Sequence, residues 1–187
     1  MAVMTTALPA AAVAALNGRL HQLALRAFMF VVLAHWAEHL AQAYQLWVLG
    51  WPRPQARGVL GMPFPWLVSS EALHYGYALV MLLGLWLLRS GFAGHARAWW
   101  TAALVLQFWH HLEHLLLFVQ AQTAHPFFGA AVPTSVAQLV FPRVELHLFY
   151  NSIVFIPMVI AMYLHLRPNE RDLAAARCAC GRPGGWL

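Results

Sequence analysis

The residues of this sequence that could do chemistry are histidines and glutamates placed a few positions apart. Two segments share the pattern H-x-x-E-H: His35-x-x-Glu38-His39 and His110-His111-x-Glu113-His114. Two more segments pair the same residue types, as Glu71-x-x-His74 and Glu145-x-His147. Imidazole nitrogens and carboxylate oxygens are ligands that iron, manganese and zinc accept in proteins. These segments therefore predict metal binding.

Helical geometry decides which members of each segment can act together. Residues four and three positions apart on an α-helix are rotated by about 40° and 60° and so share a face. His35, Glu38 and His39 then share one face, as do His110, Glu113 and His114, and likewise Glu71 and His74. Glu145 and His147 are about 200° apart, so a regular helix cannot turn both inward. Asn151 shares the face of His147 better than Glu145 does.

Three short resemblances bear on the chemistry. The pattern H-x-x-E-H is similar to that of the inverted zincins, in which two histidines bind zinc and the glutamate acts as a base. Glu71-x-x-His74 resembles the Glu-x-x-His unit of ferritin-like carboxylate proteins, from which the fourth segment departs by one residue. The His35-x3-His39 spacing resembles the first box of the histidine-box membrane hydroxylases and desaturases, whose later H-x2-H-H boxes this chain lacks. Each resemblance covers a few residues and assigns no family.

The elements that must position these residues are membrane-spanning helices. Of the 187 residues, 61% are hydrophobic and 9% are charged, and the mean hydropathy is +0.61, whereas soluble domains carry about 25% charged residues. A bilayer needs about 20 apolar residues for each helical span. Four stretches are that long: 27–49, 67–88, 99–119 and 144–164. We expect an all-α integral membrane protein, a four-transmembrane-helix bundle in a lipid bilayer, most simply the bacterial cytoplasmic membrane.

The basic residues orient these spans. All 11 are arginines scattered singly or in twos, and they form no stripe that would follow nucleic-acid phosphates. Eight arginines fall on one side of the predicted spans, and only Arg53, Arg57 and Arg143 fall on the other. The positive-inside rule then places both termini in the cytoplasm. The predicted organisation is an N-terminal cytoplasmic segment 1–22, a membrane domain 23–166 and a cytoplasmic tail 167–187.

The two halves of the membrane domain look alike. Glu38 and Glu71 are 33 residues apart, and Glu113 and Glu145 are 32 apart. This spacing predicts a duplicated helical hairpin, with repeats 23–89 and 97–166. His39 and His110 each follow a cytoplasmic arginine by 13 residues, so the polar layers fall at a similar depth, with His147 somewhat higher. A pseudo-two-fold axis along the membrane normal would suit a dinuclear metal centre.

The leading hypothesis is a non-haem dinuclear iron oxidoreductase that acts on a hydrophobic small-molecule substrate with O2. No reductase motif is evident, so electrons would come from a donor protein. Glu38 and Glu113 are the expected catalytic residues. The expected metal ligands are His35, Glu38, His39, Glu71, His74, His110, Glu113, His114 and His147. Polar residues expected behind them are His111, Glu145, Asn151, Gln42 and Gln107.

Three alternatives remain open, and manganese stays among the metals. A zinc-dependent membrane hydrolase would use Glu38 or Glu113 to activate a metal-bound water. A b-type haem protein would use histidines on facing helices as axial ligands. A metal or proton conduit would need no catalysis.

Histidines near the span ends are expected to be ordinary interfacial residues: His21, His95, His125 and His165. Cys178 and Cys180 have neither the spacing of a zinc ribbon nor enough partners for a disulfide framework, so we expect free thiols.

Overall fold

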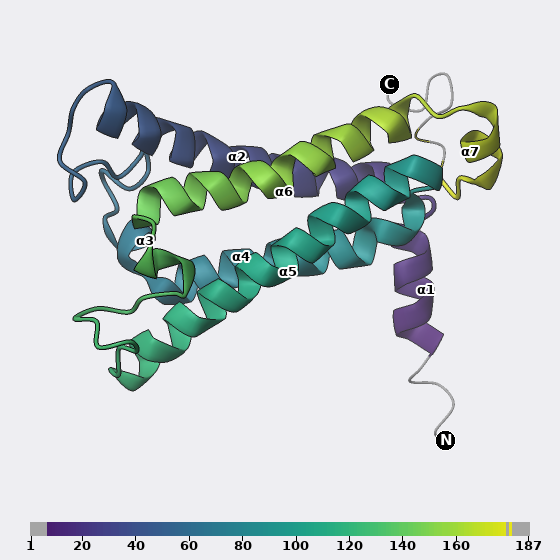
Figure 1. The fold of residues 1–187 in the computed structure, drawn as a ribbon. Coiled ribbons are helices and arrows are strands. Elements are labelled where there is room, and N and C mark those ends of the chain that lie inside the picture. The colour runs from purple at the N-terminus through teal and green to yellow at the C-terminus, as the bar shows by residue number, and fades with distance from the viewer. Residues whose placement is uncertain (1–6, 179, 181–187) are drawn as a thin grey trace. The chain divides into compact units, whose positions relative to one another are not determined.

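The computed structural model describes residues 7–178 and residue 180, and all its regular elements are helical. Residues 1–6 of the predicted N-terminal segment, and residues 179 and 181–187 of the predicted tail, lie outside the described residues. Figure 1 shows the helices in chain order: α1 (Ala7–Leu16), α2 (His21–Trp47), α3 (Trp66–Ser69), α4 (Glu71–Leu88), η1 (Arg89–Gly91), α5 (Gly94–Thr123), η2 (Ala137–Leu139), α6 (Arg143–Leu166) and α7 (Glu170–Ala175).

Four of these helices are long and apolar enough to cross a membrane, which confirms the predicted all-α class with four apolar helices. They cover His21–Trp47, Glu71–Gly91, Gly94–Thr123 and Arg143–Leu166, with mean hydropathies of 1.3 to 1.6. Only 22% to 39% of the most apolar window of each helix is buried inside the protein. Large apolar side chains such as Phe30, Val105 and Tyr163 therefore remain exposed. Apolar surface on this scale is typical of a membrane or protein interface.

The second predicted span begins later than the sequence indicated. Leu67 lies in the short helix α3, and α4 begins only at Glu71. The break is at Ser70, whose backbone is extended and whose hydroxyl accepts the Leu73 N–H at 3.3 Å. A serine in this position is a helix N-cap, so the apolar run 67–88 is interrupted by a helix start.

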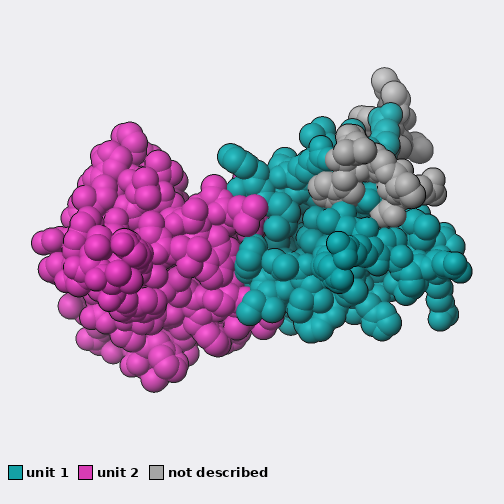
Figure 2. Space-filling model, turned by 90° about the horizontal axis from the view of Figure 1, so that it is seen from above, with its two compact units in different colours: residues 1–30, 83–105, 154–187 teal, residues 31–82, 106–153 magenta. Residues whose placement is uncertain are grey.

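The chain divides into two compact units, and each long helix contributes residues to both. Unit 1 comprises residues 1–30, 83–105 and 154–187, and unit 2 comprises residues 31–82 and 106–153. Figure 2 colours unit 1 teal and unit 2 magenta.

Unit 1 has an apolar core centred on Trp100, which is fully buried. The indole N–H of Trp100 donates to the Leu85 carbonyl at 2.8 Å, and its ring stacks on Phe92 at 4.3 Å. Gly84 allows the Phe28 ring to pack against α4, because a Cβ at Gly84 would overlap that ring. These contacts hold the unit 1 segments of α2, α4 and α5 together.

Unit 2 contains the two long connections, after α2 and after α5, and each is held by a glutamine. The Gln45 side chain accepts the Gly58 N–H at 2.8 Å and donates to the Gly58 carbonyl at 3.1 Å. The Gln120 side chain accepts the N–H groups of Phe127 (2.8 Å) and Thr134 (3.2 Å), and donates to the Thr134 carbonyl at 2.9 Å. Both loops are therefore fastened to the helix that precedes them.

Candidate metal centre

The six histidines predicted as ligands meet in unit 2. His35 and His39 come from α2, His74 from α4, His110 and His114 from α5, and His147 from α6. His147 lies at the middle of the group. Its ring centroid is 5.3 Å from that of His39, 5.8 Å from His74, 5.7 Å from His110 and 5.0 Å from His114. Four helices thus contribute imidazoles to one cluster. His147 belongs to this cluster, although the sequence predicted a somewhat higher position for it in the membrane.

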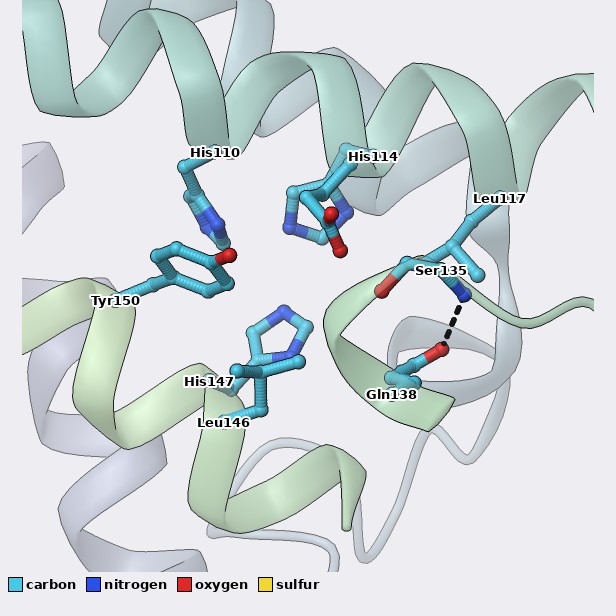
Figure 3. A pocket seen from close by; sticks show the side chains of 9 residues that line it. His110, His114, Leu117, Ser135, Gln138, Leu146, His147 and Tyr150 are labelled. Atoms are coloured by element: carbon cyan, nitrogen blue, oxygen red, sulfur yellow. Dashed lines mark hydrogen bonds between the residues drawn. The ribbon is translucent and has the colours of Figure 1, made fainter. Parts of the chain in front are cut away.

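Three of these imidazoles form the tightest group. His110, His114 and His147 each offer a nitrogen, and these atoms all lie within 4.8 Å of one another. Figure 3 shows the three rings turned toward a common space, with Tyr150 beside them. A cavity of about 10 Å³ adjoins them, which is about the size that one water molecule or ion needs. This triad could hold a metal ion.

The unpaired nitrogens of the triad favour metal binding on energetic grounds as well. The Nδ1 atoms of His110 and His114 and the Nε2 atom of His147 are buried and have no hydrogen-bond partner among the described residues. A buried polar atom left unpaired costs about 1–3 kcal/mol. A ligand that accepts these lone pairs would remove that cost.

Two of the other three imidazoles, those of His74 and His39, are oriented by a partner of their second ring nitrogen. His74 Nδ1 lies 2.8 Å from the Ser70 carbonyl oxygen, and His39 Nδ1 lies 2.9 Å from Gln42 Oε1. Because both oxygens accept, each Nδ1 carries the proton and each Nε2 keeps its lone pair. Metal-binding histidines usually have such an outer partner. His39 Nε2 lies 2.9 Å from His35 Nε2, and the His35 ring stacks on Tyr77 at 3.7 Å.

Three of the four glutamates have other partners. Glu38 accepts the backbone N–H groups of Val59 and Leu60 at 2.8 and 3.0 Å. Glu71 pairs with Arg143 through two bonds of 2.5 and 2.8 Å, and Glu145 pairs with Arg53 at 2.7 Å. These carboxylates hold loops and helix starts.

Glu113 is the one predicted carboxylate that the structure places beside the triad. It is 5% exposed and lines the same small cavity as His110, His114 and His147. Its described hydrogen bond is a long one of 3.4 Å from the Ala137 N–H. Glu113 therefore has a carboxylate oxygen available near the imidazoles.

The polar residues expected to contact the metal ligands, rather than the metal itself, lie in different surroundings. Gln42 contacts His39, as described, and Asn151 Nδ2 is buried without a hydrogen-bond partner. The Gln107 side chain donates to the Ala78 carbonyl at 3.1 Å. His111 lies against Tyr75, with 5.2 Å between ring centroids.

A larger cavity of about 280 Å³ also borders the cluster. It is lined by His39, His74 and His147, together with Arg53 and Arg143. Its volume is close to the lower limit of about 300 Å³ for small-molecule sites. A small ligand could reach the imidazoles through this space.

A second group of metal-binding residues, which the sequence did not predict, lies in unit 1. His21, His165 and Cys178 are all buried, and their ligand atoms lie within 4.8 Å of one another. His21 and His165 were expected to be ordinary interfacial residues. They are far apart in the chain and follow no common spacing, so only the fold could bring them together. Cys178 and Cys180 are free cysteines, as predicted.

Comparison of the chain with family models, with curated proteins and with solved structures finds no match to any of them. The functional assignment therefore depends on the geometry of the two histidine groups and on the four apolar helices.

Proposed function

We propose that this chain is an integral membrane metalloprotein whose six-histidine cluster binds two transition-metal ions and serves as the redox centre of an oxidoreductase. The observation that carries this proposal is the meeting of six imidazoles from four apolar helices. An energetic argument supports the proposal as well. Several polar groups buried within a membrane are costly. Metal binding, which contributes about 10–16 kcal/mol in structural zinc peptides, would offset that cost.

The six ligands would bind the two ions in two groups of three. His110, His114 and His147 are close enough to share one ion. His35 and His39, whose ring centroids are 4.4 Å apart, would bind the second ion together with His74. His147 and His74 are 5.8 Å apart between ring centroids, so the two groups adjoin. A pair of neighbouring metal ions fits this arrangement.

The donor atoms narrow the choice of metal. Nitrogen-rich sites suit copper, iron, zinc and nickel, whereas manganese prefers carboxylates. Glu38, Glu71 and Glu145 are engaged elsewhere, so we propose iron or copper as the redox-active pair. A haem is a poorer fit, because the His147 ring centroid lies only 5.0–5.8 Å from those of four other imidazoles, which would crowd a porphyrin placed between any two of them.

The chain's own residues would position and protect the pair. His39 and His74 are held by Gln42 and the Ser70 carbonyl. The larger cavity beside them, of about 280 Å³, would admit a small hydrophobic substrate and O2. The metals would supply electron transfer, and a donor protein would supply the reducing electrons.

Parallel contacts support the proposed duplication of a helical hairpin. Glu38 and Glu113 are 75 residues apart, and so are Gln45 and Gln120. Both glutamates accept backbone N–H groups from the loop that follows their helix, and both glutamines fasten that loop. Each half would then contribute an equivalent pair of loop contacts, although only Glu113 of the two glutamates lies beside the histidine triad.

The distribution of arginines supports the proposed orientation with both termini in the cytoplasm. Eight arginines fall on the side of the termini, and three, Arg53, Arg57 and Arg143, fall on the other. This is the bias that the positive-inside rule counts.

Metal analysis of the full chain in detergent tests the proposal. Reconstitution with iron or copper should load two ions on the six-histidine cluster. The double variant His39→Ala/His114→Ala should lose both, whereas the matched control His95→Ala/His125→Ala, at two exposed histidines, should retain them. A loss of less than one ion per folded chain in the first variant would contradict the proposal.

A zinc-dependent hydrolase is the second candidate, and one observation favours it. Three histidines with a carboxylate close by, as in His110, His114, His147 and Glu113, resemble catalytic zinc sites with three protein ligands and an open position. Zinc bound in place of iron or copper, with hydrolysis that a chelator abolishes, would favour this function over a redox one.

A further inference from the structure

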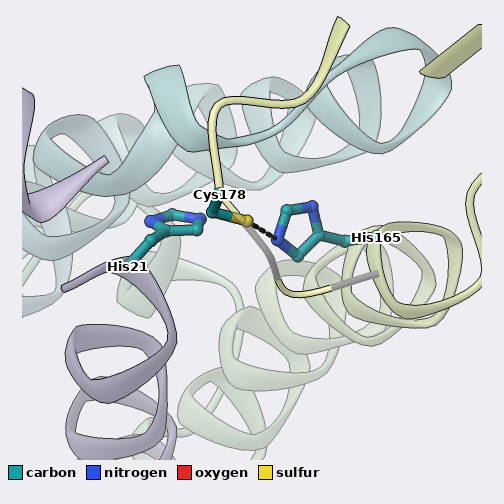
Figure 4. A group of neighbouring side chains, drawn as sticks. All are labelled: His21, His165 and Cys178. Carbon is teal, nitrogen blue, oxygen red and sulfur yellow. Dashed lines mark hydrogen bonds between the residues drawn. The ribbon is translucent and has the colours of Figure 1, made fainter. Parts of the chain in front are cut away.

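The group His21, His165 and Cys178 is a separate cluster of metal-ligating side chains in unit 1. His21 begins α2, His165 lies in the last turn of α6, and Cys178 follows α7. Their exposed fractions are 0%, 5% and 5%. Figure 4 shows the Cys178 sulfur between the two imidazoles. Burial of three such donors around one point is unusual unless they have a shared partner.

His21 is held in a conformation that suits a ligand. Its Nδ1 lies 3.0 Å from the Leu16 carbonyl oxygen and so carries the proton. Its Nε2, the remaining lone-pair nitrogen, is buried and finds no hydrogen-bond partner in the part of the chain that the structure describes. An outer carbonyl that fixes the tautomer is typical of metal-binding histidines.

The surroundings of His21 leave the ring no other position. A Cβ at Gly91 would overlap the imidazole, so the glycine is what allows η1 to pack against it. The edge of the ring also contacts Phe92, with 5.4 Å between centroids, and His165 at 5.3 Å. The imidazole is therefore positioned before any ligand binds.

The Cys178 sulfur is positioned by its neighbours. It lies 3.4 Å from His165 Nε2 and accepts the Cys180 N–H at 3.3 Å. Cysteines bind metals through this sulfur atom, which lies between the two imidazoles with which it would share an ion (Figure 4).

We infer that His21, His165 and Cys178 bind a second kind of metal ion, Zn²⁺, through two imidazole nitrogens and one sulfur. Histidine and cysteine are both zinc ligands, and a zinc site with three protein ligands takes its fourth ligand from water or another bound group. Such a site would fasten the segment after α7 to α2 and α6. It is independent of the proposed redox function, because it shares no residue with the six-histidine cluster.

Cobalt is the probe that separates this site from the six-histidine cluster. Thiolate ligation of Co²⁺ gives a charge-transfer band in the near ultraviolet, which histidine ligation alone does not. The full chain in detergent should show this band at one Co²⁺ per chain. The variant His39→Ala/His114→Ala should keep the band, and Cys178→Ser should abolish it while keeping the ions of the six-histidine cluster.

A second variant keeps all the ligands and changes only their support. Gly91→Ala would displace the His21 ring and should weaken Co²⁺ binding by about 10-fold or more. Zinc X-ray absorption on the His39→Ala/His114→Ala variant should show sulfur as well as nitrogen ligands, without any change to Cys178. Absence of sulfur ligands, a charge-transfer band that survives Cys178→Ser, or a Cys178–Cys180 disulfide in the isolated protein would overturn the inference.

Discussion

Replacing Glu38 by glutamine distinguishes a metal ligand from a loop anchor. The Glu38 carboxylate accepts N–H groups from Val59 and Leu60 at 2.8 and 3.0 Å. A hydrogen bond to a charged group is worth about 1.5–3 kcal/mol. Glutamine keeps one acceptor oxygen but loses the charge and the second acceptor, so Glu38→Gln should lower the free energy of unfolding by about 1.5–3 kcal/mol. Metal content should remain unchanged.

Unfolding in mixed detergent micelles, followed by circular dichroism, measures the first quantity, and elemental analysis of the same sample measures the second. Gly58→Ala gives an independent check from the loop side. Gly58 has φ of +77°, and a Cβ there would overlap the Glu38 carboxylate, so this substitution should destabilise the same contact. A Glu38→Gln protein that keeps its full stability but loses a metal ion would refute the assignment of Glu38 as an anchor.

Glu113→Gln should behave in the opposite way, because Glu113 lines the cavity of the histidine triad and its hydrogen bond from the Ala137 N–H, the one found among the described residues, is long at 3.4 Å. We expect metal affinity or activity to fall by about 10–100-fold with little change in unfolding free energy, as measured by metal titration beside the same micelle assay. The two ion pairs should also differ in a double-mutant cycle of unfolding free energies. Removal of Arg143 and Glu71, whose side chains are 38% and 10% exposed, should give a coupling of about 0.5–3 kcal/mol. Arg53 and Glu145, at 58% and 28% exposed, should give about 0.2–1 kcal/mol; equal couplings would show that burial does not separate the two pairs.

Local spacing accounts for what could be predicted from the sequence. A four-residue interval puts His35 beside His39 on any α-helix. The length of an apolar run can be read from the sequence of that run alone, so the four spans could be predicted as well. The same intervals fix His110 and His114 on one face of α5. The similar depth of the four segments along their spans then predicted that the six histidines lie in one layer. The structure does place them together.

The partners of the glutamates could not be predicted in this way, because they lie in irregular loops. Glu38 is satisfied by backbone N–H groups more than 20 residues further along the chain. Helical periodicity says which face Glu38 occupies, but it carries no information about a loop that folds back on that face. His21 and Cys178 illustrate the same limit, because only tertiary packing joins the first residue of α2 to a residue beyond α7.

The glutamine anchors of the two long loops have a consequence for hydrogen exchange. Amides in irregular loops normally exchange fast, because their opening costs little free energy. The N–H groups of Gly58, Phe127 and Thr134 are instead bound to Gln45 or Gln120. Their exchange should therefore be slowed to the rate at which the whole loop lifts from its helix. The exchange rates of these amides would therefore report how often the loops open the space beside the histidines.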